Sequence, residues 1–173
     1  MNERLRKKHQ GREDLVGEYR FGDIGQLILL FMFIVVWVAD SFFLKCSTFF
    51  SLYIPWYVQI PPAILILFAS GYLAQNGLKT VFGEVRAEPE VVDKGVFGLV
   101  RHPIYLGAIL FYLAMIILTI SLFSISIFLV IIVFYNYLAR YEEKLLLDKF
   151  GSEYEKYMNR VPMWFPGLRK KKN

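Results

Sequence analysis

A run of 35 residues without a charged side chain, from 104 to 138, constrains this sequence more than any other feature. An α-helix rises 1.5 Å per residue, so a straight helix of that length would measure about 52 Å. The hydrocarbon core of a bilayer is only about 30 Å thick. The segment must therefore fold back, and the Thr- and Ser-containing stretch 119–124 at its midpoint is the natural place. We predict a tight hairpin of two helices of about 17 residues each. Helices of this length are at the short end for spanning a bilayer, so a hairpin that crosses the membrane only in part is an alternative.

Two earlier apolar runs also have the length of membrane spans. Residues 24–44 are interrupted only by Gln26 and Asp40, and the run is too long for the apolar region of a cleaved signal peptide, so we expect it to be retained. Residues 54–74 contain three prolines, which predict a bent or late-starting helix. We therefore predict an all-α integral membrane protein with four transmembrane helices, and leave a fifth open.

Composition agrees with the membrane assignment and excludes other classes. Apolar residues make up 56% of the chain, against about 45–50% in soluble domains. One cysteine, Cys46, excludes an intramolecular disulfide, and no cluster of His and Cys has the spacing of a metal site, so we predict no metal. The net charge of +5 does not by itself predict nucleic-acid binding.

The positions of the basic residues predict the orientation. Six Lys and Arg precede residue 24, four lie between 76 and 103, and nine follow from Arg140 onward, which leaves only Lys45 on the other side. Four spans place the three basic regions together in the cytoplasm, as the positive-inside rule requires. Both termini are then cytoplasmic. The basic tail 169–172 is either solvated or in contact with anionic lipid.

The two ends of the hairpin carry the chemistry. His102 and Glu142 are each 20 residues from position 122, so they should return to the same membrane face. Pro103 suits the first helical turn, which places His102 at the N-cap and Tyr105 on the same face. Arg101 beside a helix N-terminus favours an anion, whereas the pair Glu142 and Glu143 would favour a cation or bind hydroxyls. A zwitterionic or dipolar ligand would fit between them, although these side chains could equally be interfacial anchors.

A helix-turn-helix follows the hairpin. Gly151 should end the long helix, and a capping box at 152–155 should open a second one that runs to about residue 159. Apolar residues at helical spacing predict one buried stripe across both helices: Leu146, Phe150, Tyr154, Tyr157 and Val161. The aromatic segment 163–166 is either an interfacial anchor or a lid over a pocket.

Five motifs at this spacing resemble the isoprenylcysteine carboxyl methyltransferase family, and the likeness is closest to its small prokaryotic members. The motifs are Gly95-Val96-Phe97, the RHPxYxG element 101–107, the pair Glu142-Glu143, the FGSEY element 150–154, and Arg160-Val161-Pro162. The resemblance covers residues 91–166. From hydropathy we expect an N-terminal part, residues 1–90, with an arm, two spans and a cytoplasmic loop. The resemblance implies a C-terminal catalytic subdomain, residues 91–173, at the cytoplasmic interface.

The resemblance also implies the cofactor, the partners and the setting. The cofactor is S-adenosylmethionine, bound without a Rossmann domain. The expected partners are a lipophilic small-molecule or prenylated acceptor and membrane lipids, with no nucleic acid, and the expected form is a monomer in a prokaryotic plasma membrane. Carried over onto this sequence, the cofactor-binding positions are Glu90, Val91, Val92, Phe97, His102, Pro103, Ile104, Tyr105 and Glu142.

Three residues are the candidates for catalysis. We expect Glu142 to hold polar groups of the cofactor, and Arg101 and Arg160 to contact the carboxylate of the acceptor, which is ionised at pH 7 and needs no base. Eukaryotic members carry an acceptor-binding Arg where this sequence has Leu138, so the acceptor can differ.

Three alternatives stay open. A phospholipid N-methyltransferase would need Glu143 or His102 to remove a proton from an amine. A sterol-type membrane reductase would use a nicotinamide cofactor, and a membrane scaffold would bind no cofactor.

Overall fold

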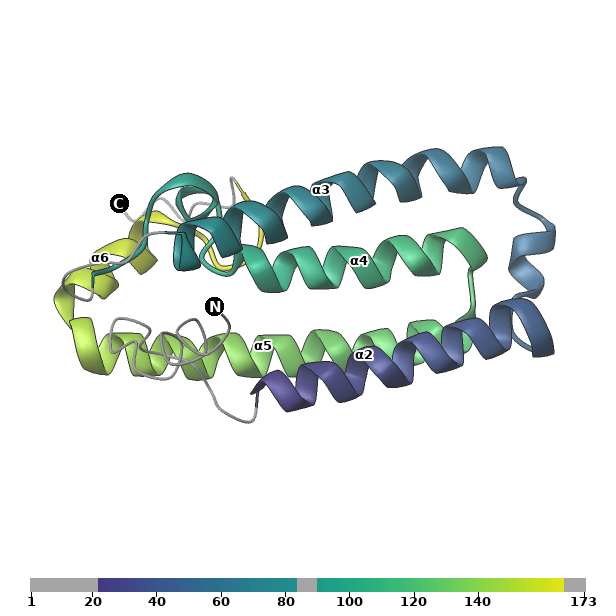
Figure 1. Cartoon of the computed structure of the whole chain (residues 1–173), viewed down its shortest axis with the longest axis horizontal. Coiled ribbons are helices and arrows are strands. Elements are labelled where there is room, and N and C mark those ends of the chain that lie inside the picture. The colour runs from purple at the N-terminus through teal and green to yellow at the C-terminus, as the bar shows by residue number, and fades with distance from the viewer. Residues whose placement is uncertain (1–21, 84–89, 167–173) are drawn as a thin grey trace, which may run out of the picture.

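The computed structural model describes residues 22–83 and 90–166, and every regular element in these two ranges is a helix. The basic N-terminal arm before residue 22 and the basic tail 169–172 lie outside the described residues. Figure 1 shows the long helices side by side along one axis, with α3 beside α4 and α2 beside α5. The all-α prediction is confirmed.

The first two apolar runs form helices that are longer than predicted. Helix α2, Gly22–Val38, continues as a π-helix, Ala39–Leu44, so that the span has 23 residues. Helix α3, Trp56–Phe82, starts after an N-cap proline, runs on through Pro61 and Pro62, and ends eight residues beyond the predicted end at 74. Hydropathy marks where the bilayer ends and not where the helix ends, which explains the difference.

The predicted hairpin is confirmed. Helix α4, Pro103–Thr119, ends at Ile120, which adopts a left-handed conformation with φ 49°. Helix α5, Leu122–Phe150, begins at once, and the hydroxyl of its N-cap residue Ser121 accepts from the backbone N–H of Ser124. The two arms are unequal, with 17 and 29 residues, because α5 continues past the apolar run into charged sequence.

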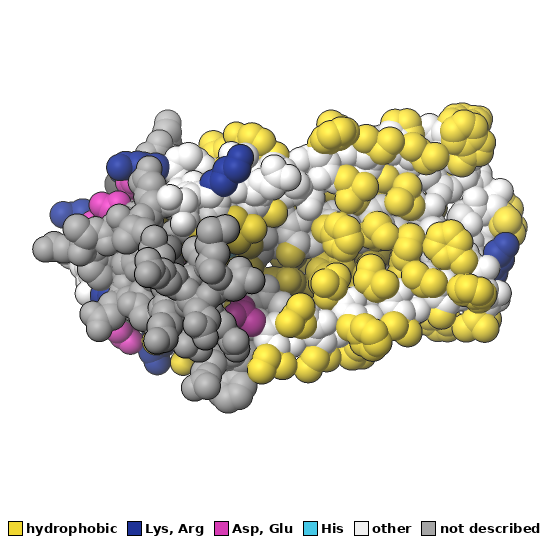
Figure 2. Space-filling view, in the orientation of Figure 1, with side chains coloured by type: hydrophobic (Ala, Val, Ile, Leu, Met, Phe, Trp, Pro, Cys, Tyr) yellow, Lys and Arg dark blue, Asp and Glu magenta, His cyan; other side chains and the backbone are white. Residues whose placement is uncertain are grey.

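Within residues 22–83 and 90–166, three helices are long and apolar enough to cross a membrane, and α4 is an apolar helix of 17 residues at the short end of that range. The predicted four spans therefore correspond to three long helices and one short one. Apolar side chains cover the surface along the long helices in Figure 2, whereas charged side chains gather near one end of the molecule. On this apolar surface, large side chains such as Phe31, Leu65 and Phe68 are at least 70% exposed. A surface of this kind is stable in hydrocarbon, so the chain is an integral membrane protein.

The helix-turn-helix is present, but its predicted capping box is wrong. Gly151, at φ 52°, ends α5 and is also the N-cap of α6, Ser152–Arg160, which has no side-chain cap. Ser152 is the first residue inside α6, so it does not occupy the N-cap position that a capping box requires. The predicted stripe is confirmed, since Tyr154, Tyr157 and Val161 are buried together and Leu146 and Phe150 pack against them.

Small residues bring α3 and α4 into close contact. A Cβ atom on Gly107 would lie 3.0 Å from the carbonyl oxygen of Ser70 and 3.2 Å from the backbone nitrogen of Ala74. The Ser70 hydroxyl donates to the carbonyl of Gly107 at 2.7 Å. Small residues at such a crossing let two membrane helices approach closely, and this crossing fixes the start of α4.

Replacing Gly107 with Val should therefore separate these helices. We expect a loss of about 1–3 kcal/mol, the usual cost of overpacking, because the atoms in the way belong to the backbone of α3. Thermal unfolding in detergent measures the effect. Gly71→Val is the matched control, since a Cβ atom there meets nothing within 4 Å. Equal unfolding temperatures for the two variants would contradict the prediction.

Candidate functional site

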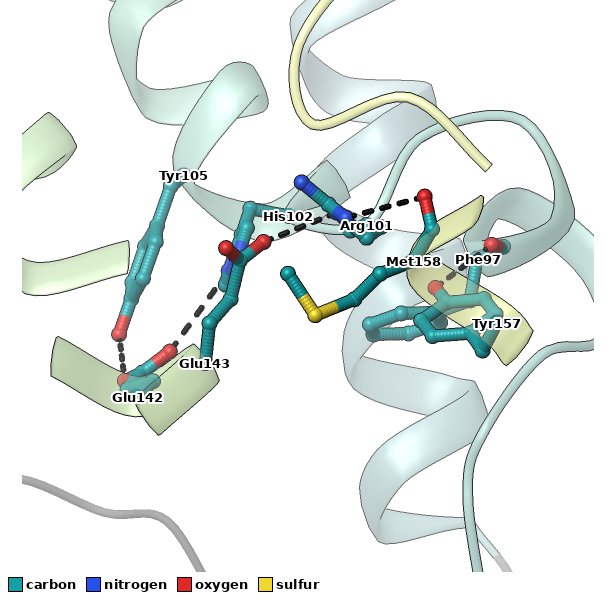
Figure 3. Close-up of polar contacts among 8 residues, drawn as sticks. All are labelled: Phe97, Arg101, His102, Tyr105, Glu142, Glu143, Tyr157 and Met158. Carbon is teal, nitrogen blue, oxygen red and sulfur yellow. Dashed lines mark hydrogen bonds and ion pairs between the residues drawn. The ribbon is translucent and has the colours of Figure 1, made fainter. Parts of the chain in front are cut away.

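His102 lies between the two glutamates at the end of the hairpin. Its Nδ1 is 3.7 Å from Glu142 Oε2, and its Nε2 is 3.2 Å from Glu143 Oε1. The Tyr105 hydroxyl donates to Glu142 Oε1. Figure 3 shows these four side chains converging from α4 and α5. His102 and Glu142 were predicted to meet because each is 20 residues from position 122, and this prediction is confirmed.

The start of α4 presents His102 and Tyr105 on one side. Pro103 occupies the first turn, where its missing N–H has no partner to lose, and His102 is the N-cap residue. Tyr105 is three positions further on, close to one helical turn. The two rings stack almost parallel, with centroids 5.7 Å apart and planes 3° apart. Both therefore face the end of α5 that carries the glutamates.

Arg101 joins the C-terminal segment to the hairpin. Its Nε lies 2.8 Å from Glu143 Oε1 as an ion pair, although the Nε–H is not aligned for a hydrogen bond. Its Nη1 donates to the carbonyl of Met158 at 3.2 Å, and its backbone N–H donates to the carbonyl of Pro162 at 3.0 Å. The side chains of Arg101 and Glu143 are only 11% and 9% exposed. Arg101 thus connects α5 to α6 and to the segment that follows it.

The structure does not bring Arg160, the other predicted catalytic arginine, to the glutamates. Its Nη2 forms an ion pair with Asp93, and its side chain is 56% exposed. This pair lies on the surface, where Arg160 joins α6 to the segment that precedes the 3₁₀-helix Gly95–Gly98.

Two further aromatic residues adjoin the cluster. The ring of Trp164 is 5.9 Å from that of His102, and the ring of Tyr135 is 5.3 Å from that of Tyr105. Trp164 therefore lies beside the cluster, which favours the lid over the interfacial anchor. Tyr135 was not predicted, although it precedes Glu142 by seven residues, two helical turns, and this spacing puts both on one face of α5.

The predicted cofactor positions 90–92 line a separate polar cavity of about 490 Å³. It lies between the end of α3 and the start of α6, and its lining comprises Asn76, Lys79, Thr80, Glu90, Val91, Val92, Asp93, Lys94 and Glu153. Val91 also packs against the buried core of α6. Of the other predicted cofactor residues, Ile104 faces Gly77 of α3, and the carbonyl of Phe97 accepts from the Tyr157 hydroxyl at 2.8 Å.

Burial raises the pKa values of the two buried phenols of α6. It raises the pKa of Tyr157 above the ordinary value, and nearby Arg101 opposes the rise only in part. Burial likewise raises the pKa of Tyr154, and the charge of Glu143 adds to the effect. The Tyr157 hydroxyl donates to the carbonyl of Phe97, which ties the 3₁₀-helix to α6.

Residues 63–153 match the phospholipid methyltransferase family. The match covers just over half of the chain and includes both ends of the hairpin and both glutamates. The chain belongs to this family. The family is part of the same superfamily of integral membrane methyltransferases as the isoprenylcysteine carboxyl methyltransferases, and its members generally use S-adenosylmethionine. No curated protein matches the chain.

The two arginines should differ sharply in their effect on stability. Arg101→Ala removes the arginine partner of the buried Glu143 carboxylate and leaves it only the His102 ring, and breaking comparable buried pairs costs about 3–5 kcal/mol. Arg160→Ala removes an exposed pair that contributes about 0–1 kcal/mol. Chemical unfolding of both variants measures the difference, and Arg101→Ala with Glu143→Gln should recover part of the loss. Similar losses for both single variants would contradict the assignment of Arg101 to structure.

Proposed function

We propose that the chain is an S-adenosylmethionine-dependent methyltransferase that acts on a lipophilic acceptor at the cytoplasmic surface of the membrane. One observation carries the proposal: His102 and Tyr105 on α4 contact Glu142 on α5 within the segment that matches the family. The positive-inside pattern supports cytoplasmic termini and a cytoplasmic site. We further propose a monomer in a prokaryotic plasma membrane, on the resemblance to the small prokaryotic methyltransferases.

The residues at the site fit this cofactor. It carries a sulfonium cation and an ammonium group, for which carboxylates are natural partners, and the cluster provides Glu142 beside His102. A carboxylate of the cofactor would be favoured at the N-terminus of α4. The cavity lined by residues 90–92 has about 490 Å³, within the range of about 300–1,000 Å³ typical of small-molecule sites. We propose that Glu142, His102 and Tyr105 hold the amino-acid part, and that the cavity takes the nucleoside.

Bound there, the sulfonium supplies an electrophilic methyl group. The chain's own residues orient the reactants and exclude water. Trp164 and Tyr135 border the cluster with apolar ring surface, and His102 and Glu143 are less than a tenth exposed. Placing nucleophile and methyl group about 3–3.5 Å apart in line can supply several kcal/mol of the barrier. Alignment in a dry site is therefore the main contribution that we assign to the protein.

The acceptor that the sequence resemblance suggests is the carboxylate of a prenylcysteine or a similar lipid. A second candidate, the amine of a phospholipid, is favoured by a specific observation: Arg101 and Arg160 are each paired with an acidic side chain. Neither of the two predicted arginines is therefore left unpaired to bind the carboxylate of an acceptor. An amine must lose a proton before it attacks, and His102 or Glu143 would accept it.

Binding of S-adenosylhomocysteine tests the cofactor site. We expect the protein in bilayer nanodiscs to bind it, and Glu142→Gln and His102→Ala each to weaken binding about 10- to 100-fold, as loss of a hydrogen bond to a charged group does. Calorimetry measures the affinity. Asp148→Asn, an exposed residue further along α5, is the control and should bind like wild type. A folded wild-type protein that does not bind S-adenosylhomocysteine, the product formed from the cofactor, would refute the proposal.

The pH dependence of methyl transfer distinguishes the two acceptors. A carboxylate with a pKa of about 3.3–3.7 is ionised throughout pH 6–8, so its rate should be nearly flat. A lipid amine is mostly protonated in this range, so its rate should rise by up to about tenfold per pH unit, as the reactive neutral form does. Transfer of labelled methyl groups to a prenylcysteine analogue and to an aminophospholipid, each with saturating cofactor, measures both profiles. If methyl groups are transferred to neither substrate, both proposed acceptors, the prenylcysteine carboxylate and the phospholipid amine, are wrong.

A further inference from the structure

A buried carboxylate lies at the opposite end of the helices from the candidate site. Asp40, in the π-helix Ala39–Leu44, is 1% exposed. Its Oδ1 accepts from the backbone N–H of Ser47 at 3.0 Å, and its Oδ2 accepts from the hydroxyls of Ser47 and Ser121, the latter at 2.6 Å. The structure gives Asp40 no ion pair with a described residue. Burying an unpaired charge is costly unless other groups stabilise it.

The stabilising group is the N-terminus of α5. The Ser47 hydroxyl accepts from the backbone N–H of Phe123 at 3.1 Å, and the Ser121 hydroxyl accepts from that of Ser124 at 3.1 Å. Each hydroxyl therefore connects one amide of the first turn of α5 to the carboxylate of Asp40. The N-terminus of a helix carries a partial positive charge. Asp40 thus caps α5 through two serines, although it belongs to the π-helix that continues α2.

Two unfavourable backbone conformations adjoin these contacts. Ile120, a β-branched residue, and Lys45 both adopt left-handed conformations, with φ 49° and 50°. Ile120 directly precedes Ser121, and the backbone N–H of Lys45 donates to the carbonyl of Asp40 at 2.8 Å. Such conformations persist only where the surrounding contacts hold them. The side chain of Asp40 is one of the groups that hold this turn, through the hydroxyls of Ser47 and Ser121.

We propose that the negative charge of Asp40 is a latch that holds the end of α2 to the strained turn between α4 and α5. The latch consists of Asp40, Ser47, Ser121 and Ser124, of which the last two are completely buried. Its release would free the turn from which both arms of the hairpin start. The proposal rests on the fold and not on the proposed methyl transfer, so it can fail independently of that function.

Hydrogen exchange of the full chain in nanodiscs tests the latch with Asp40→Asn. The amide keeps the shape but loses the charge, and it places a donor against hydroxyls that already donate. We expect exchange in residues 119–126 to rise by about tenfold or more, because hydrogen bonds to charged groups contribute most, and exchange in 141–150 to stay unchanged. Ser41→Ala, which removes a neighbouring hydroxyl contact with Thr119, is the control and should leave residues 119–126 protected.

A milder variant keeps the test decisive if Asp40→Asn does not fold. Ser47→Ala retains the charge but removes one connecting hydroxyl, and Ser47 lies far from the hairpin in sequence. Exchange in 119–126 should then rise by a smaller factor than in Asp40→Asn. Unchanged exchange there in Ser47→Ala, or an effect of Asp40→Asn no larger than that of Ser41→Ala, would overturn the proposal.

Discussion

The thickness of the bilayer imposes the constraint on which this structure depends. An uncharged segment too long to cross the hydrocarbon core once must turn back, and it does so at Ile120 and Ser121. The turn sets which residues meet at the far ends of α4 and α5. Because α5 continues well beyond the apolar run, it brings its two glutamates to the polar N-terminus of α4, where His102 lies.

The charges of the site divide between structure and chemistry. Glu143 is paired with Arg101, whose other contacts hold the C-terminal segment against the hairpin. Glu142 is contacted by the Tyr105 hydroxyl and the His102 ring. Glu143 thus contributes to the contacts that fix the fold of the site, and we assign the cofactor to Glu142. The two adjacent glutamates share His102, but Arg101 is a partner of Glu143 and Tyr105 is a partner of Glu142.

Sequence reasoning succeeded where length and periodicity decide the outcome. The hairpin turn, the N-cap at His102 and the stripe ending at Val161 follow from bilayer thickness, proline geometry and the 3.6-residue period. Sequence reasoning failed where several partners are available to one side chain. No sequence pattern pairs Arg160 with Asp93, or Asp40 with serines of a distant turn. The capping box failed for a related reason, because the conformation of Gly151 decided which residue capped α6.

Photochemical crosslinking of methyl-labelled S-adenosylmethionine to the protein in native-like bilayers tests the central claim most directly. If the two ends of the hairpin form the cofactor site, label should appear in peptides from both 90–105 and 135–150, and excess S-adenosylhomocysteine should abolish it. Label confined to α2 or the beginning of α3, or label that the product does not compete away, would show that the meeting of His102 with the glutamates is not the site of cofactor binding.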